Sequence, residues 1–352
     1  MQINRLNNSL FKIVSMKFIF VFFSFLYLSA AFAQIGGKTT YEFLNLPVSP
    51  KISALGSKNI TLLNDDPSNA IVNPSLINYR MDNHLSVNYM NYLADINYGT
   101  ASFAHLIDRR TQVVHASMTY INYGSFDGYD ENGNSTSSFS GNEASLQFGY
   151  ATQIGRSDFY AGANFRLITS KLEQYTSFAT SVDLGVSYIY EEWDLVVSGV
   201  LRNIGYQFKA YDDIREDLPF EVILGISQNL KNVPIRWHVT YDQAQIWNIA
   251  FGNTNRDEVD LEGNITRDDP SFFNNILRHS ILGVEVFPEG GFNIQLGYSF
   301  RRGEELRIDD QRAFAGLSGG FSLRFNKWRF SYAYSQFNRA GASSFFGLNL
   351  KL

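Results

Sequence analysis

The sequence predicts an all-β protein, a fourteen-stranded antiparallel transmembrane β-barrel with a small N-terminal hatch segment. Three observations predict this fold. Apolar and polar residues alternate almost without interruption from residue 84 to the end of the 352-residue chain. Most alternating segments have about ten residues or more, the length that a tilted membrane-crossing strand needs. The links between the segments alternate between short and long, as they do in outer-membrane barrels.

The composition agrees with a β-rich envelope protein and excludes several classes of function. The chain has 20 Tyr and 30 Phe against only 8 Pro, which favours pleated strands that carry rows of aromatic side chains. Its net charge of -5 and its lack of a Lys/Arg-rich stripe argue against nucleic-acid binding. It has no cysteine, which excludes disulfides, thiolate metal sites and a lipid-anchored cysteine.

The N-terminus carries the most specific local signal. Lys12 and Lys17 precede the apolar run "FIFVFFSFLYL", and the small residues of "SAAFA" follow it. This order predicts a cleaved signal peptide over residues 1–33, with Met16 as an alternative start to Met1. An uncleaved membrane anchor is the less favoured alternative, because the run is short for a membrane span. The mature chain is therefore expected to be an integral outer-membrane protein.

The barrel is expected over residues 84–352, with one strand for each alternating segment. The last segment places Phe346, Leu348 and Leu350 on one face, so it needs a neighbour on its open edge. Pairing with the first strand would supply that neighbour and close the barrel. The predicted strands span about 84–93, 95–106, 111–123, 143–154, 158–170, 176–190, 194–203, 219–230, 234–247, 279–288, 291–301, 316–325, 327–338 and 344–352.

The stretch "EASLQFGYATQI", residues 143–154, illustrates how the two faces of a strand are assigned. In a barrel the apolar face meets lipid and the polar face meets the lumen, whereas in a soluble sandwich the apolar face meets a protein core. A charge at Phe148 is expected to cost about 2 to 4 kcal/mol at the bilayer midplane, whereas a charge at Gln147 is expected to be tolerated. The predicted lipid-facing residues are Leu146, Phe148, Tyr150 and Ile154, and the predicted lumen-facing residues are Ser145, Gln147 and Gln153.

The lengths of the links predict which end of each strand faces the periplasm. The links after every second strand are brief, for example "GRS" and "EEWD". The remaining links are expected to be longer outer loops, notably "GSFDGYDENGNSTSSFSG", "NIGYQFKAYDDIRED" and the insertion over residues 248–278. The link near residue 94 is an exception, because it is brief on the side of the long loops. Short turns lie in the periplasm and long loops lie outside in outer-membrane barrels.

Residues 34–83 are predicted to form a periplasmic or lumenal hatch. Turn and cap signals such as "NLPVSP", "NDDP" and "NPS" join short apolar pieces in this segment. Such a segment cannot build its own core, but it fits the lumen of a fourteen-stranded barrel, which is wide enough to need a plug. Asn73, Pro74 and Ser75 form the candidate hatch motif.

Three stretches carry a resemblance to a known family. "TTYEFLNLPVSPKISALGSKNITLLNDDPSNAIVNPSLI", "DNHLSVNYMNYLADINYG" and "YINYGSFDGYDENGN" resemble the PorQ family of the type IX secretion system of Bacteroidota. Within them, Asn73-Pro74-Ser75 is similar to the Asn-Pro-Ala element of FadL-like barrels, the wider group that includes PorV. The resemblance covers the whole mature chain with one small departure, since the family's Gly-Gly after Ala-Leu is Gly56-Ser57 here.

The resemblance implies a non-enzymatic barrel of the cell-surface attachment complex. Its expected partner is a PorZ-like protein, alongside PorU-like and PorV-like components, and outer-membrane lipid and lipopolysaccharide are expected around the barrel. The alternative is a FadL-like transporter of hydrophobic small molecules, with Gly185 and Gly199 as kinks that open a strand. A lumen sealed by polar contacts, with no apolar pocket, would count against transport.

No catalytic, cofactor or metal site is predicted. An enzymatic site would need a Ser or Asp within hydrogen-bond reach of a histidine. Asp130, Asn132 and Asn134 have the spacing that opens a calcium loop, but Gly141 stands where a bidentate Glu is needed, which favours a polar surface loop. The histidines lie on separate segments, and none belongs to a nucleophile elbow or an HExxH pair: His84, His105, His115, His238 and His279.

The longest outer loop carries the candidate partner-docking surface. Asp269 is predicted to cap a short helix that has Pro270 at its first position. The apolar residues of this helix fall at helical spacing and are expected either to pack over the barrel mouth or to contact a partner: Phe272, Phe273, Ile276 and Leu277. The acidic residues before the helix are expected to be solvated or to bind a divalent ion or a basic partner: Asp257, Glu258, Asp260, Glu262, Asp268 and Asp269.

Overall fold

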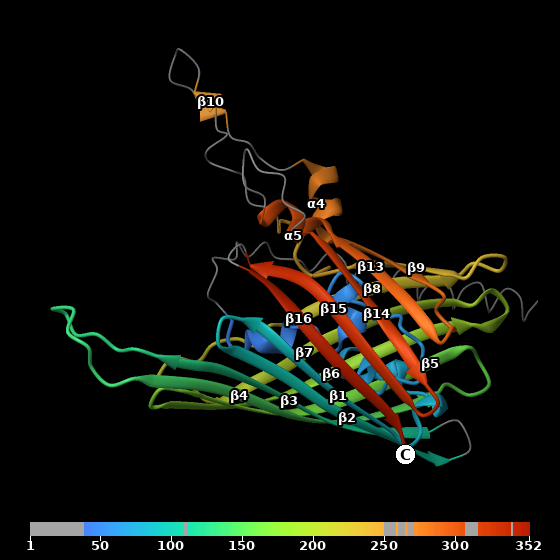
Figure 1. Ribbon diagram of the computed structural model, residues 1–352, viewed down its shortest axis with the longest axis horizontal. Helices are drawn as coiled ribbons and strands as arrows, with labels where there is room; N and C mark the ends of the chain where they lie inside the picture. The colour runs from blue at the N-terminus through green and yellow to red at the C-terminus, as the bar shows by residue number, and fades with distance from the viewer. Residues whose placement is uncertain are drawn as a thin grey trace, which may run out of the picture. The chain divides into compact units, whose positions relative to one another are not determined.

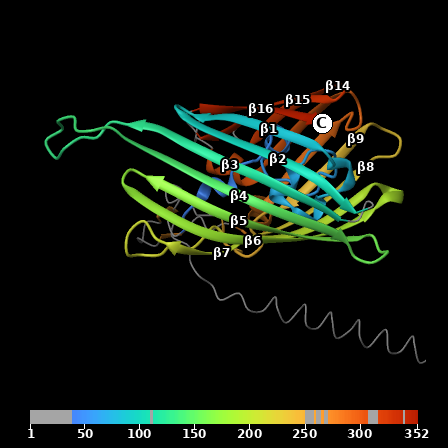
Figure 2. The same ribbon diagram turned by 90° about the horizontal axis from the view of Figure 1, so that it is seen from below.

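A closed β-barrel forms the described part of the chain. The computed structural model describes residues 39–108, 112–249, 258–259, 265–266, 271–306, 316–338 and 341–352. Within these residues, fourteen strands join into one closed barrel, and each pairs with its neighbours antiparallel, which confirms the predicted fold class. Figures 1 and 2 show the strands running alongside one another around the short helices of the N-terminal segment. The predicted signal peptide, Asp269 and Pro270 lie outside the described residues, as do the acidic residues before them apart from the backbone of Glu258.

Most barrel strands lie within a few residues of their predicted spans. The exceptions are β7, which is longer, and β9, which ends at Tyr241 instead of continuing to residue 247. The barrel strands are β1 (His84–Leu93), β2 (Ile96–Asp108), β3 (Gln112–Phe126), β4 (Phe139–Gln153), β5 (Phe159–Leu172), β6 (Tyr175–Tyr190), β7 (Leu195–Lys209), β8 (Glu221–Asn229), β9 (Ile235–Tyr241), β12 (Ser280–Val286), β13 (Phe292–Ser299), β14 (Leu317–Phe325), β15 (Trp328–Asn338) and β16 (Gly341–Lys351).

The first and last strands close the barrel, as the amphipathic C-terminal segment predicted. β1 and β16 pair antiparallel from His84 opposite Lys351 to Asn91 opposite Ser344. Their pairing leaves neither strand with an open edge, so every backbone group in the wall can find a partner without water.

The outer surface of the barrel is apolar and its inner surface is polar. The side chains of Phe148 on β4 and of Ile154, just after it, are 55% and 50% exposed, whereas Ser145 and Gln147 are buried inside the barrel. Leu146 and Tyr150 also face outward, which confirms the two faces predicted for this strand except at Gln153, which is half-buried and donates to the Ser157 carbonyl in the turn that follows. A polar lumen inside an apolar outer face is the arrangement of an outer-membrane barrel, and it excludes the soluble sandwich.

The alternation of short and long links holds only in part. The links at residues 127–138, 210–220 and 242–279 are long, as predicted. However, β5 and β6 are joined by a tight turn at residues 173–174, on the side where long loops were expected. Glu173 adopts a positive φ of 58° there, and its amide donates to the Ser140 carbonyl. The ladder therefore runs further than the hydrophobic alternation indicated, and this link is a hairpin turn instead of a loop.

Residues 39–83, called the lumen segment below, fold inside the barrel as five short helices. Proline and asparagine define their starts: Asn73 and Asn78 cap the helices that follow them, and Pro50 and Pro74 stand in first turns. The helices are η1 (Glu42–Asn45), α2 (Pro50–Ala54), α3 (Asn69–Val72), η2 (Pro74–Leu76) and η3 (Tyr79–Met81).

The lumen segment is packed against the whole inner wall. Helix α2 contacts β13 to β16, η2 contacts β4 to β6, and η3 contacts β2. Ile52, Leu62 and Leu76 are almost completely buried. Ile52 and Leu62 belong to a small cluster formed by the segment itself, whereas Ala70, Ile77 and Met81 pack against apolar residues of the wall. The segment therefore has a small core of its own, which the sequence did not predict, and the wall adds to it.

A C-terminal cap fixes the end of α2 against the wall. The amide of Ser57 donates to the Ile52 carbonyl, and the amide of Gly56 donates to the Ser53 carbonyl, which is a Schellman motif. Gly56 has φ +99° and Ser57 has φ +80°, so both residues are left-handed. The second position thus suits glycine, and serine stands there with its hydroxyl accepting from Arg302 at 2.7 Å.

The remaining elements lie in the links. They are η4 (Glu191–Trp193), the small hairpin of β10 (Glu258–Val259) and β11 (Ile265–Thr266), and the helices α4 (Phe272–His279) and α5 (Phe300–Glu305). Ser271 caps α4 by accepting from the Asn274 amide, so the helix begins two residues later than the predicted cap at Asp269 implied. No helix in the described ranges is long and apolar enough to cross a membrane.

Candidate functional site

The predicted hatch motif lies buried between the lumen segment and the wall. The side chain of Asn73 accepts from the Ser75 amide at 3.0 Å and donates to the Ile60 carbonyl at 2.8 Å. The hydroxyl of Ser75 lies 2.6 Å from that of Ser187 on β6. Asn73 therefore shapes the local turn, and Ser75 joins that turn to the barrel. The motif acts in this structure as a lock between the two parts of the protein.

Two glycines in the wall make room for this motif. A Cβ atom on Gly185 of β6 would lie 2.5 Å from the Asn73 carboxamide oxygen, and one on Gly162 of β5 would lie 2.5 Å from the Pro74 carbonyl oxygen. Gly185 and Gly199 do not kink their strands, because the pairing of β6 with β7 is continuous across both. The expectation of glycine kinks was thus wrong, and Gly185 serves close approach.

The irregularity in this part of the wall lies elsewhere. The register of β6 against β7 shifts between Val182 and Leu184, opposite Asn203, which has φ 58°. Polar bonds fill the bulge: Asp183 accepts from the Asn203 amide at 2.8 Å, and the Asn203 side chain accepts from Arg166 at 2.6 Å. These bonds fill the bulge with side chains, although Nε of Arg202, the other bulge residue of β7, has no hydrogen-bond partner within the described residues.

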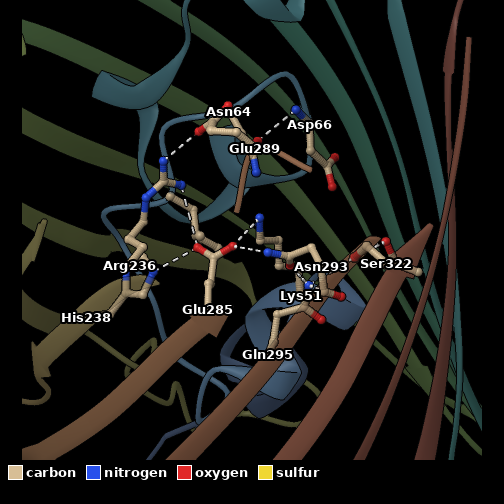
Figure 3. A network of polar contacts seen from close by, with 12 residues as sticks. Lys51, Asn64, Asp66, Arg236, His238, Glu285, Glu289, Asn293, Gln295 and Ser322 are labelled. Carbon is tan, nitrogen blue, oxygen red and sulfur yellow. Dashed lines mark hydrogen bonds and ion pairs between the residues drawn. The ribbon is translucent and has the colours of Figure 1, made fainter. Parts of the chain in front are cut away.

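A buried carboxylate links the lumen segment to the wall through three cationic or hydrogen-bonding side chains. Glu285 of β12 receives Lys51 of α2 at 2.6 Å, His238 of β9 at 2.9 Å and Arg236 at 3.6 Å. Figure 3 shows these three side chains converging on the Glu285 carboxylate, with Asn293 beside it. The Glu285 side chain is completely buried, so its charge depends on these partners in place of water.

One histidine lies between a hydroxyl and a carboxylate. Thr61 and His238 are 3.2 Å apart, and the other ring nitrogen of His238 contacts Glu285. The order hydroxyl, imidazole, carboxylate resembles a hydrolase triad, yet Thr61 is 1% exposed and also contacts Asn59. The Thr61 hydroxyl is buried and thus closed to a substrate. The contacts instead hold the lumen segment to the wall.

The other four histidines do not converge. His84 lies 4.0 Å from Asp65 at the short-turn end, and the exposed His105 lies 3.2 Å from Asp82. The ring of His279 donates to the Asp242 carbonyl at 2.6 Å, and His115 is buried on β3. No group of three metal-ligating side chains occurs among the described residues.

Asp130 organises its own loop. Its carboxylate accepts from the amides of Asn132 and Asn134 at 2.9 and 2.8 Å, and from the Asn134 side chain at 2.9 Å. These bonds lower the pKa of the Asp130 carboxyl, the Asn134 side chain having the largest effect. The residues that suggested a calcium loop are therefore joined to one another in a polar turn.

Charged residues join the lumen segment to the outer loops. Lys58 forms ion pairs with Glu221 and with Asp242, the latter at 3.1 Å, and Arg301 of α5 reaches the same Asp242 at 3.3 Å. Burial raises the pKa of the Asp242 carboxyl, but Lys58 and Arg301 outweigh burial, so that the pKa lies below its ordinary value of 3.8. Asp242, directly after the end of β9, thus stays ionised.

A small pocket of about 200 Å³ lies beside these charges, between the lumen segment and α5. The Arg302 guanidinium lines it, 5.0 Å from the ring of Phe337, and donates to Ser57. Two nitrogens of that guanidinium, Nε and Nη2, have no hydrogen-bond partner within the described residues. Burial, together with Arg301, lowers the pKa of Arg302 to about 10.

The predicted docking residues are exposed on α4. Phe272 and Phe273 are 61% and 75% exposed, and Leu277 is also exposed. Ile276 is less exposed than these three and is half-buried. The buried side of the helix is formed by Asn275 and His279, and the helix packs mainly against α5 and also touches β12. Phe272 also packs on Trp247, with 5.0 Å between the ring centroids. The helix therefore buries its polar side and, within the described part of the chain, leaves most of its apolar side exposed.

Comparisons with known proteins support no family assignment. No protein-family model matches the sequence, and no curated protein is significantly similar to it. Among solved structures, a TodX monoaromatic hydrocarbon channel mutant is 12% identical, with a TM-score of 0.47, over 87% of this chain and 97% of that chain. A Pseudomonas aeruginosa FadL homologue is 11% identical, with a TM-score of 0.46, over 86% and 97%. The KdgM porin is 8% identical, with a TM-score of 0.34, over 76% and 99%.

Proposed function

We propose that this protein is a non-enzymatic, plugged outer-membrane barrel that holds a protein partner at the cell surface. The proposal rests on two features of the same molecule: a lumen segment fixed to the wall and an outer helix with exposed apolar side chains. The lumen segment is fastened to the wall by buried polar contacts around Glu285 and Asn73, while α4 exposes Phe272 and Phe273 on the longest outer loop. A blocked lumen and an uncovered apolar helix suit docking better than passage.

The resemblance to the PorQ family suggests which partner binds. It implies a PorZ-like protein of the type IX attachment complex, with PorU-like and PorV-like components beside it. The apolar side of α4 would meet the partner, since a helix that presents aromatic anchors at helical spacing is a common recognition surface. Lipopolysaccharide around the barrel is a further expectation of the same resemblance.

Affinity purification from native outer membranes tests this proposal. The tagged chain, extracted in mild detergent, is expected to recover a PorZ-like partner, and deletion of the chain is expected to impair display of secreted cargo. Recovery of no such partner, together with intact cargo secretion after deletion, would overturn the proposal.

Transport of hydrophobic small molecules is the second candidate. The pocket of about 200 Å³ favours it, because apolar Leu46 and Phe337 line that pocket together with Arg302, whose guanidinium is only partly hydrogen-bonded. The closed bulge at Asn203 counts against it, since Asp183 and Arg166 fill the place where the wall would open. Uptake of a hydrophobic compound into cells that express the chain, lost on Arg302→Gln, would favour this function over docking.

A further inference from the structure

A large cavity lies at the end of the barrel away from α4. It has a volume of about 620 Å³ and is lined by the turns at residues 287–291 and 326–327 and by the end of β16. In Figure 1 the end of β16, marked C, and α4 lie at opposite ends of the barrel strands. Short turns face the periplasm in outer-membrane barrels, so the cavity opens on the periplasmic side.

The cavity is basic in an acidic protein. Seven lysines and arginines line it against three aspartates and glutamates, and only Lys51 and Arg236 among the seven also pair with the buried Glu285, whereas the whole chain carries a net charge of -5. A concave site lined by one sign of charge concentrates ligands of the opposite sign, because the low-dielectric walls focus the field. We call this cavity the basic vestibule.

An aspartate of the chain itself already occupies part of the vestibule. Asp65, on the lumen segment, receives Arg324 of β14 at 2.9 Å and both terminal nitrogens of Arg329 of β15. Paired contacts from one guanidinium are the geometry with which arginine binds carboxylates. The wall of the vestibule thus holds an acidic side chain that is carried by an irregular stretch of backbone.

Two further cations in the vestibule have no such occupant. Lys327 lies in the turn between β14 and β15, and Lys351 ends β16 beside it, where its amide donates to the Lys327 carbonyl. Both residues are exposed, and neither ammonium group has an ion-pair partner within the described ranges. A carboxylate bound at this place would meet both cationic side chains and would therefore be stabilised by them.

We propose that the basic vestibule binds an acidic peptide segment of a periplasmic protein. Lys327 and Lys351 would receive its carboxylates next to Asp65, in the way that Arg324 and Arg329 receive Asp65 itself. The volume fits a short segment, because cavities of about 300 to 1,000 Å³ enclose ligands of that size. This site is separate from the docking of a surface partner at α4, and either of the two can fail without the other.

Binding of a labelled hexaglutamate peptide to the full chain in detergent, followed by fluorescence anisotropy at low salt, tests the proposal. The double variant Lys327→Gln/Lys351→Gln is expected to bind the peptide about tenfold more weakly. The matched control is Arg156→Gln/Lys231→Gln, which removes the same charge from other short turns that do not line the vestibule. This control is expected to change the affinity by less than about twofold.

Further arms keep the result decisive. Asp65→Asn frees Arg324 and Arg329 and is expected to strengthen peptide binding. This arm tests the vestibule without any change to the two lysines. Equal weakening in the control and the lysine variant, or equal binding of a hexalysine peptide, would overturn the proposal. So would displacement of the peptide by inorganic phosphate more effectively than by chloride at the same ionic strength, because the vestibule would then be a site for small anions.

Discussion

Gly162 of β5 lies directly against Pro74 of the lumen segment, where an added Cβ atom would be 2.5 Å from the Pro74 carbonyl oxygen. The carbonyl carbon and oxygen of Pro74 that the Cβ atom would meet belong to the backbone, so they cannot move aside as a flexible side chain could. We therefore expect Gly162→Ala to push the lumen segment from the wall and to lower the free energy of unfolding by about 1 to 3 kcal/mol. Thermal unfolding in detergent measures this loss.

Gly199→Ala is the matched control for this prediction. The nearest atom to a Cβ at Gly199 is a methyl group of Leu224 at 3.4 Å, which is ordinary contact. The control is expected to unfold at the wild-type temperature. An unchanged Gly162→Ala variant would show that the lumen segment is not held as closely to β5 as described.

Removal of the charge on Glu285 should be strongly destabilising. Glu285→Gln leaves Lys51 and Arg236 without their buried anion, and a broken buried ion pair of this kind costs about 3 to 5 kcal/mol. Urea unfolding of the purified barrel measures the loss. Glu289→Gln provides the comparison, since Glu289 also binds Arg236 but its side chain is 72% exposed, and the expected change is below about 1 kcal/mol.

The sequence predicts the barrel well because the outer face of its wall needs apolar side chains and the inner face needs polar ones. Phe148 and Gln147 are neighbours in the chain, yet one faces outward and the other inward, so the strand pattern is visible without any knowledge of the partners. The same pattern does not predict the turn at Glu173, since a positive φ in a tight turn leaves no mark on the alternation. Turn chemistry is local, and only glycine or asparagine would have indicated it.

The buried ion pair of Lys51 and Glu285 could not be predicted from the sequence, for a different reason. Lys51 and Glu285 are far apart in the chain, and nothing in either segment indicates that the other one is its partner. The motif at Asn73, Pro74 and Ser75 could be singled out, because proline and asparagine have short-range roles that the sequence reveals. Its contact with Ser187 depends on the register of the lumen segment in the barrel, which only the fold supplies.

The structure changes the expected effect of charges on β4. Phe148→Arg is still expected to cost about 2 to 4 kcal/mol if Phe148 lies at the bilayer midplane. Gln147, however, accepts from Arg166 at 3.0 and 2.7 Å, so the sign of a charge at this position matters. Gln147→Glu should be tolerated and Gln147→Lys should destabilise the barrel, as measured by unfolding in lipid vesicles. Equal stability of the two Gln147 variants would show that Arg166 does not depend on residue 147.

The ion pairs of Asp242 predict a loss of stability only in strong acid. A carboxyl whose pKa is lowered by folding contributes stability above its unfolded pKa and loses it as the pH falls through the folded pKa. Since Asp242 has a pKa below 3.8, its contribution should be constant from neutral pH down to about pH 5 and should fall below about pH 4. The unfolding temperatures of the wild type and Asp242→Asn should therefore converge in acid. A difference that grows on acidification would contradict this assignment.

Partner binding should depend on Phe273 more than on any other residue of α4. Its ring is 75% exposed, and it belongs to the apolar side of the helix, opposite the buried Asn275 and His279. We expect Phe273→Ser to abolish recovery of the surface partner in affinity purification, because an exposed aromatic anchor can contribute 2 kcal/mol or more, roughly, to an interface. The barrel should keep its unfolding temperature, since few neighbours lose contact.

Ile214→Ser is the control for this prediction. Ile214 is an apolar residue that is 81% exposed on a different outer loop, and its replacement should leave recovery unchanged. Equal recovery with both variants would place the partner elsewhere on the surface.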